Sequence, residues 1–375
     1  MIDDDLNAII SELNASGGAP RSAAGTDVES LLTDVIERRG SDLLLVAGSQ
    51  PAVRVDGVIA RLDGPILDGT DVEEAVIPLL PAHAKQQYQE QHVADASLRL
   101  PRLGRFRVNL HRERGRAAAA IRVLPARVPR LADLNLPPEI AALSSLGRGL
   151  VLVGGATGAG KTTTLAALVD EINQRDARHI ITVEDPIEYE HQHQRSVIEQ
   201  VEIGADAPDF PTALRSAVRQ APDVLVIGEM RDHESMRIAL AAAETGHLVF
   251  SSLHTTDIAS SIARICDSFP NERQNTIRQE LSLALSAVMT QTLIPKIGGG
   301  RIPAAELLMV SYGARQHIRK NALQHLHQEM AITRRQGSIS LEDSLGRLVR
   351  SGQITHADAA TRAGHPDELE SILRG

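Results

Sequence analysis

The 375-residue sequence is poor in cysteine and in aromatic side chains: it has one cysteine, no tryptophan, three tyrosines and four phenylalanines. The single cysteine, Cys266, excludes an internal disulfide framework and any zinc site built from several cysteines. We therefore expect Cys266 to be a buried free thiol. With so few aromatic rings, the core must consist mainly of leucine, isoleucine, valine and alanine.

The sequence also lacks long apolar runs and an excess of positive charge. No stretch approaches the 18 uninterrupted apolar residues typical of a membrane-spanning helix, and the acidic start MIDDDLNAII lacks the basic region of a secretory signal. The net charge of -9 argues against a protein that binds nucleic acid through a broad positive surface. We expect a cytoplasmic protein that contacts membranes only through a partner.

The length predicts at least two domains, and changes in composition indicate where they lie. Residues 1–25 are rich in Ser, Ala, Gly and Asp, a composition typical of a mobile tail. Residues 26–126 have the pattern of a small α+β domain, and the proline-punctuated stretch 127–134 is expected to be a linker. Residues 135–314 alternate strand and helix patterns, and residues 315–375 have a helical pattern.

The first domain is expected to open with a helix and continue with strands. TDVE predicts a capping box in which Thr26 accepts from the amide of Glu29, and Gly40 is expected to close the helix. SDLLLVAG is typical of a buried strand, and Asp56-Gly57 is a strong signal for a two-residue hairpin turn. Further strands are expected in GRFRVNLHRERG and AAAAIRVLP.

From Gly149 onward, strand, glycine-rich loop and helix patterns alternate, which predicts an α/β fold with a mainly parallel sheet. The expected strands are LVLVGG, HIITVED, DVLVIGE and HLVFSSLH, and the expected helices include KTTTLAALVDEINQ, FPTALRSAVRQA and DHESMRIALAAAETG. In the helical tail, GSISLED and GQITHAD each place Ser or Thr three residues before Asp, so each is expected to open a helix.

GATGAGKT, at residues 155–162, matches the phosphate-loop pattern G-x-x-x-x-G-K-[ST] between a strand pattern and a helix pattern. Its glycines let successive amides turn inward around a phosphate, and Lys161 adds a full positive charge. The Thr162 hydroxyl is then the natural Mg²⁺ ligand, so we expect ATP to bind with Mg²⁺. The expected nucleotide-binding residues here are Gly155, Ala156, Thr157, Gly158, Ala159, Gly160, Lys161, Thr162 and Thr163.

Acidic residues follow two of the expected parallel strands. ITVEDPIE ends a strand at Glu184 and Asp185, and VLVIGE ends one at Glu229. Because the carboxyl ends of parallel strands converge on one crevice, these carboxylates are expected beside the phosphate loop. Hydrolysis of a γ-phosphate needs one group to activate water and another to hold the metal, so we assign Glu184 as the base and Glu229 to the metal side, acting through water. The sequence alone also allows the exchanged roles.

Two histidines, His247 and His254, lie at the ends of HLVFSSLH. As a strand rises about 3.3 Å per residue, they would stand roughly 23 Å apart and cannot share one metal. His254 is expected in the crevice, within hydrogen-bonding reach of the γ-phosphate. His247 is expected outside it, facing another domain or subunit.

Arginines are concentrated in two places. Arg215 and Arg219 share one face of an expected helix, and GRFRVNLHRERGR contains Arg105 and Arg107. Either group can act as an arginine finger on a neighbouring subunit's nucleotide. By spacing alone, a solvated face is the better explanation for each group.

These motifs, in this order and spacing, resemble the secretion ATPase superfamily, which includes motors of type II secretion and type IV pili. The phosphate loop corresponds to Walker A, ITVEDPIEYEH to the Asp box, DVLVIGEMRD to Walker B and TGHLVFSSLHTTD to the His box. The resemblance implies a RecA-like P-loop ATPase domain behind a PAS-like N-terminal domain, assembled as a hexameric ring. It also implies that Arg215, Arg219, Arg105 and Arg107 reach nucleotide across subunits.

Within the superfamily, the chain most resembles the ATPases that retract type IV pili in twitching motility. It is short and lacks the four-cysteine zinc insertion common among assembly and secretion members. The resemblance implies an inner-membrane pilus platform protein as partner. The alternatives are a pilus assembly or type II secretion ATPase, and an accessory nucleotide-binding paralogue with little turnover.

Overall fold

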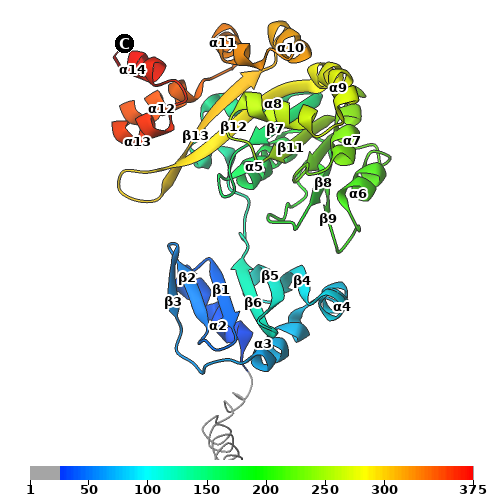
Figure 1. Ribbon diagram of the computed structural model, residues 1–375, viewed down its shortest axis with the longest axis vertical. Helices are drawn as coiled ribbons and strands as arrows, with labels where there is room; N and C mark the ends of the chain where they lie inside the picture. The colour runs from blue at the N-terminus through cyan, green and yellow to red at the C-terminus, as the bar shows by residue number, and fades with distance from the viewer. Residues whose placement is uncertain (1–25, 375) are drawn as a thin grey trace, which may run out of the picture. The chain divides into compact units, whose positions relative to one another are not determined.

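The computed structural model describes residues 26–374, so the tail expected at residues 1–25 lies outside the described residues. The chain divides into two compact units after Ala126 (Figure 1). Each unit has its own sheet and hydrophobic core.

The first unit is built on an antiparallel sheet in the order β3-β2-β1-β6-β5-β4. Its elements are α2 (Val28–Glu37), β1 (Asp42–Val46), β2 (Ala52–Val55), β3 (Val58–Arg61), α3 (Gly69–Val76), the 3-10 helix η1 (Ile77–Leu79), α4 (Ala82–Gln91), β4 (Val93–Leu100), β5 (Gly104–Glu113) and β6 (Arg116–Val123). The hairpin expected at Asp56-Gly57 joins β2 to β3, and φ values of 49° and 83° at these two residues are those of a type I′ turn. The α+β character expected for this segment is confirmed.

The start of α2 differs from the expectation in one residue. Asp27, and not Thr26, is the N-cap, since the Asp27 Oδ1 atom accepts from the amides of Glu29 at 3.1 Å and Ser30 at 3.3 Å. A carboxylate one residue later reaches the same free amides and adds a favourable charge at the helix N-terminus. At the other end, the left-handed residue is Arg39 (φ 55°), and Gly40 instead makes the close approach to Val53 that a side chain would block.

The second unit is built on a sheet in the order β13-β12-β7-β11-β10-β8-β9, parallel except for β13. Its strands are β7 (Gly149–Gly154), β8 (His179–Glu184), β9 (Val197–Glu202), β10 (Val224–Ile227), β11 (Leu248–Leu253), β12 (Leu285–Pro295) and β13 (Arg301–Met309). Its helices up to β12 are α5 (Lys161–Arg175), α6 (Phe210–Ala217), α7 (His233–Glu244), α8 (Ile258–Asp267) and α9 (Asn271–Ala284), with the 3-10 helices η2 (Leu131–Leu134) and η3 (Pro138–Ser145). The parallel α/β fold predicted from the alternating pattern is confirmed.

Helices cover both faces of this sheet and form a hydrophobic core on each face. Successive residues of β7 point alternately into these two cores. Leu150 and Leu152 pack with side chains of α6 to α9, whereas Val151 and Val153 pack with α5 and the 3-10 helices η2 and η3. A strand buried on both faces has a continuous apolar sequence, which is why LVLVGG was recognisable. Cys266 of α8 is a buried free thiol, as expected, and burial raises its pKa to about 11.

Strands β9, β12 and β13 were not predicted, because polar residues interrupt their apolar pattern. In β12, Thr290 and Gln291 are buried, and their hydrogen bonds go to residues distant in sequence: Glu306 for Thr290, and Ala159 and Thr164 for Gln291. A buried polar side chain of this kind is stable only once those partners are in place. Local sequence therefore does not distinguish these strands from polar helical segments.

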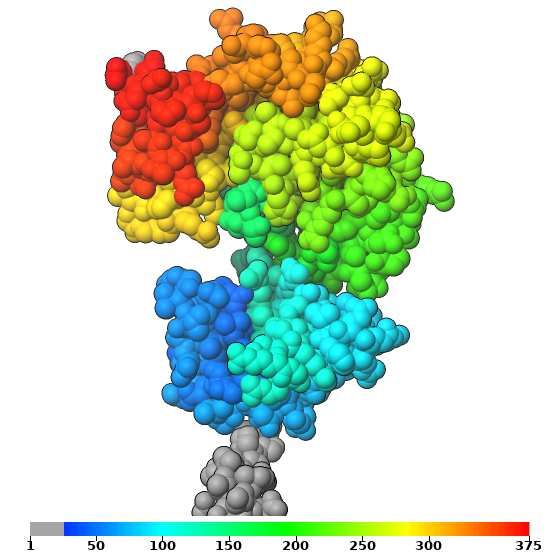
Figure 2. Space-filling model, viewed as in Figure 1, coloured from blue at the N-terminus to red at the C-terminus, as the bar shows by residue number. Residues whose placement is uncertain are grey.

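The C-terminal residues form short helices, as predicted. They are α10 (Tyr312–Arg319), α11 (Leu326–Ile332), α12 (Leu341–Arg350), α13 (His356–Arg362) and α14 (Pro366–Arg374), with the 3-10 helices η4 (Leu323–His325) and η5 (Arg334–Gln336). Ser340 caps α12 and Thr355 caps α13, which confirms both expected helix starts. Helices α12 to α14 form a small core with the β12–β13 hairpin, and the red and yellow surfaces adjoin in Figure 2. Within the described part of the chain, none of the helices has both the length and the apolarity needed to cross a membrane.

Replacing the N-cap of α2 tests the corrected helix start. We expect Asp27→Ala to destabilise the first unit by about 1 kcal/mol, since two amides lose their acceptor. Thr26→Ala is the matched control: the Thr26 hydroxyl is buried without a hydrogen-bond partner, so its loss should cost little. Hydrogen exchange of the α2 amides measures both changes. Equal effects, or a larger effect at Thr26, would contradict the assignment.

Candidate functional site

The phosphate loop runs from the end of β7 to the first residue of α5. Its glycines are required by the backbone: Gly155, Gly158 and Gly160 have φ values of 153°, 78° and 91°. A side chain at Gly155 would meet the Gln291 carbonyl oxygen at 2.7 Å, and one at Gly158 would meet nothing within 4 Å. The loop is thus held tightly at its base and open at its tip. This is the shape a loop needs if its amides are to surround a phosphate.

Lys161 is buried and points back over the loop. Its ammonium group donates to the carbonyl oxygens of Gly155 at 2.8 Å and Ala156 at 3.1 Å. Burial lowers the pKa of Lys161, and the nearby carboxylates of Glu229 and Glu188 act in the opposite direction. A buried ammonium whose hydrogen-bond partners are backbone carbonyls can be stabilised further by an anion. The loop residues present therefore fit a triphosphate.

The residues around Thr162 suit the metal that accompanies a triphosphate. Thr162 and Glu184 line the same small cavity beside Gly228, directly before Glu229. Hydroxyl and carboxylate oxygens are the ligands Mg²⁺ prefers. The next residue of α5, Thr163, is engaged differently, since its hydroxyl lies 3.0 Å from that of Tyr189.

Gln291 of β12 supports the phosphate loop, and sequence reasoning missed it. Its side-chain amide donates to the Ala159 carbonyl oxygen at 2.7 Å and accepts from the Thr164 hydroxyl at 2.8 Å. It therefore joins the loop to the first turn of α5 from a strand more than a hundred residues later in the sequence. The only signal available was a glutamine within a largely apolar segment, and that signal does not identify its partner.

Glu184 lies at the carboxyl end of β8, as predicted. Burial raises the pKa of its carboxyl, while hydrogen bonds from Thr182 at 2.7 Å and Gln200 at 3.2 Å stabilise the ionised form. Both donors are neutral. Their fixed positions orient the carboxylate without cancelling its charge.

Glu229, just after β10, and His254, just after β11, together connect these strand ends to the phosphate loop. Glu229, whose side chain is 15% exposed, lies two residues after β10 and pairs with Arg231. Its other oxygen is 3.5 Å from the His254 Nε2 atom. The His254 Nδ1 atom is 3.4 Å from the Thr157 hydroxyl and 3.5 Å from the Lys161 ammonium. His254 therefore stands between the carboxylate and the loop.

The other predicted residues of this unit lie elsewhere. His247 precedes β11, and its Nδ1 atom is 2.9 Å from the Ala242 carbonyl oxygen. It lines a cavity of about 370 Å³ with Arg215, Arg219 and Arg237, and no phosphate-loop residue lines that cavity. Arg215 belongs to α6 and pairs with Glu234, whereas Arg219 lies in the turn after the helix, which ends at Ala217. Within one chain, these arginines do not join the loop.

Arg105 and Arg107 belong to β5 of the first unit. Arg107 forms an ion pair with Asp95 of the neighbouring strand β4, with an Nε–Oδ1 distance of 3.4 Å. Arg105 and Arg107 are both half-buried positions of this strand.

A family model described as type II/IV secretion system protein matches residues 24–362. The chain belongs to that family. The Pseudomonas aeruginosa type IV pilus retraction ATPase PilT is 39% identical over 343 residues, which cover 92% of this chain and all of the relative. The type IV pilus ATPase PilU of the same organism is 35% identical, and the matched region covers 93% of this chain and 91% of PilU.

A solved structure gives the same assignment for the fold. The crystal structure of the pilus retraction motor PilT with bound ADP is 42% identical and superimposes with a TM-score of 0.84. The matched region covers 92% of this chain and 99% of the PilT chain. The structural similarity therefore extends over both units of this chain.

Replacing Gln291 tests its support of the loop. We expect Gln291→Ala to weaken ATP binding roughly tenfold, because the Ala159 carbonyl oxygen and the Thr164 hydroxyl lose a buried partner. Titration with a fluorescent ATP analogue measures the change. Gln279→Ala, at an exposed position of α9, is the control and should leave the affinity unchanged. An unchanged affinity in Gln291→Ala would show that the loop keeps its shape without this residue.

Proposed function

We propose that the chain is an ATP-hydrolysing motor that drives type IV pilus retraction. The observation that carries the proposal is the combination of a phosphate loop, Glu184 and the Glu229–His254 pair at adjoining strand ends with full-length similarity to PilT. In this proposal the motor is a hexameric ring in the cytoplasm. The ring acts on an inner-membrane platform protein, and that partner is its contact with the membrane.

The charges around the two glutamates favour Glu184 as the base. Glu229 already contacts Arg231 and His254, so its two carboxylate oxygens are engaged by these neighbours. The described residues that donate hydrogen bonds to Glu184 do so from neutral groups, and burial raises its pKa, so it accepts a proton more readily. Glu184 is accordingly assigned to activate water, and Glu229 to hold the metal side together with Thr162.

The remaining assignments concern the phosphates. Lys161 and the loop amides bind the triphosphate, and bound Mg²⁺ would neutralise charge on the β- and γ-phosphates. His254 touches both the loop and Glu229, so it is placed to respond to the γ-phosphate. Arg215, Arg219, Arg105 and Arg107 are assigned to a neighbouring subunit's nucleotide. The absence of Arg215 and Arg219 from the loop of their own chain is compatible with that role.

Replacing Glu184 tests the catalytic assignment. We expect Glu184→Gln to bind ATP and to lower the rate of phosphate release roughly a hundred- to ten-thousandfold, because the amide cannot accept the proton. In the wild type, kcat should fall as the pH drops through the raised pKa of Glu184, since the base must be ionised. The residual rate of Glu184→Gln should not show this decline at low pH.

Glu199→Gln is the matched control, because Glu199 is a half-exposed residue of β9 paired with His179. Its rate and pH profile should equal those of the wild type. Near-background phosphate release in both the wild type and Glu184→Gln would instead favour an accessory nucleotide-binding paralogue with little turnover.

Deleting the gene tests the direction of force. We expect cells with excess surface pili that do not retract and that have lost twitching motility, with both defects reversed by the wild-type gene and not by Glu184→Gln. Electron microscopy and time-lapse imaging of labelled pili give the readout. Cells without pili would overturn retraction in favour of an assembly ATPase.

A further inference from the structure

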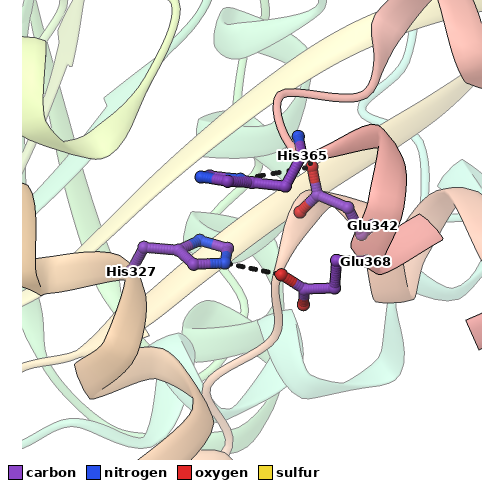
Figure 3. A group of neighbouring side chains, drawn as sticks. All are labelled: His327, Glu342, His365 and Glu368. Carbon is purple, nitrogen blue, oxygen red and sulfur yellow. Dashed lines mark hydrogen bonds and ion pairs between the residues drawn. The ribbon is translucent and has the colours of Figure 1, made fainter. Parts of the chain in front are cut away.

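Two histidines and two glutamates, side chains of the types that can bind a metal ion, meet among the C-terminal helices, away from the phosphate loop (Figure 3). His327 comes from α11, Glu342 from the first turn of α12, His365 from the residue before α14, and Glu368 from the first turn of α14. One ligand atom of each lies within 4.8 Å of all the others. No step of the proposed ATPase reaction uses these residues.

We propose that this cluster binds one divalent transition-metal ion of the zinc class, which fastens α12 and α14 to α11. The two sides of the cluster belong to different hydrophobic cores. Leu326 and Met330 of α11 pack in a core of the main sheet, whereas Leu345 of α12 and Leu369 of α14 pack in the small core on the β12–β13 hairpin. A metal held by all four side chains would therefore join those two cores.

The charges of the four groups suit a divalent cation. The Glu342 side chain is only 2% exposed, and its ion-pair partner is His365, with an Nδ1–Oε1 distance of 3.6 Å. Glu368 pairs with His327 at 2.7 Å. Among the described residues, neither glutamate has an ion pair with a lysine or arginine. With neutral imidazoles the four groups carry two negative charges, and a divalent ion cancels both.

The two ligand-atom distances within the histidine–glutamate pairs can be compared with those of a four-coordinate site, and all four ligand atoms lie within 4.8 Å of one another. Two ligands each about 2.1 Å from a tetrahedral zinc ion lie roughly 3.4 Å apart. The His365–Glu342 distance of 3.6 Å is near this value, and the His327–Glu368 distance of 2.7 Å must lengthen by less than an ångström. The two imidazole rings stack with centroids 3.9 Å apart and planes at 25°. Since a nitrogen binds metal in the plane of its ring, His365 must turn, and its 55% exposed side chain is free to do so.

Hydrogen bonds already orient the carboxylates, as outer-shell groups do in metal sites. The His365 amide donates to Glu342 at 2.8 Å, and the Ser340 hydroxyl donates to Glu368 at 3.3 Å. The donor set then selects the ion. Two imidazole nitrogens with two carboxylates suit zinc and its neighbours, whereas Mg²⁺ and Ca²⁺ prefer oxygen ligands alone.

Zinc binding by the full-length, untagged, metal-stripped and nucleotide-free protein tests the proposal. Calorimetric titration with zinc chloride should show one site per chain with a submicromolar dissociation constant, and Mg²⁺ or Ca²⁺ should not compete. His365→Ala and Glu368→Gln should each weaken that site at least a hundredfold, beyond the ten- to hundredfold cost of losing an outer-shell group. Glu368→Gln keeps the shape of the side chain, so its loss of zinc binding could not be attributed to misfolding, as that of the alanine variant could.

The chain offers a matched control for ordinary surface binding. His356 and Glu370 form an exposed pair at 2.6 Å on α13 and α14, outside the cluster. The double variant His356→Ala, Glu370→Gln should bind zinc like the wild type. Zinc should also slow hydrogen exchange in α12 and α14 of the wild type and not of Glu368→Gln, a readout independent of ATPase activity.

Replacing zinc by cobalt gives a spectroscopic check. Co²⁺ held by the four ligands should show the visible absorption of a tetrahedral site. His365→Ala should lose this absorption. The proposal fails if the wild type takes up no more zinc than His365→Ala and Glu368→Gln. It also fails if the tight site is lost in the His356→Ala, Glu370→Gln control. Either result would leave the cluster as two histidine–glutamate ion pairs.

Discussion

The parallel register of β7, β11, β10 and β8 is the constraint on which the site depends. Leu253 of β11 pairs with Gly154 of β7, and Ile227 of β10 pairs with both Ser251 of β11 and Val183 of β8. These four strands therefore end nearly level with one another. Whatever follows each strand end, whether loop, glutamate or histidine, is delivered to the same edge of the sheet. The buried apolar strands hold the polar groups in place, because any slip in register would expose the core.

The polar groups at that edge have different surroundings although they are close together. Lys161 and Glu184 are both affected mainly by burial, which lowers the pKa of the lysine and raises that of the glutamate. Each is brought nearer to its neutral form, so a bound anion would stabilise the ammonium of Lys161, and the carboxylate of Glu184 accepts a proton more readily. Glu229 is instead held by Arg231 and His254. The difference between the two glutamates thus arises from their neighbours, since both follow a β-strand in the same sheet.

The C-terminal helices show the same dependence on packing at smaller scale. Helices α11 to α14 are short, and short helices are marginal in isolation. Side-chain caps at Ser340 and Thr355 fix where α12 and α13 begin, and a small apolar core on the β12–β13 hairpin holds them. The His327–Glu368 and His365–Glu342 pairs bring polar groups from separate helices together at the edge of that core. Sequence spacing gives no sign of this meeting, because the residues lie up to 41 positions apart.

The sequence by itself determined the α/β class, the four parallel strands, the phosphate loop and the positions of Glu184, Glu229 and His254, because each depends on a local pattern of apolar runs and glycines. Only the tertiary structure decided that β12 is a strand, that Gln291 supports the loop and that Asp27 caps α2. It also separated Arg215 and Arg219 from the loop of their own chain. The physical reason is that buried polar groups are stable only with partners, and those partners are chosen by the folded chain and not by neighbours in sequence.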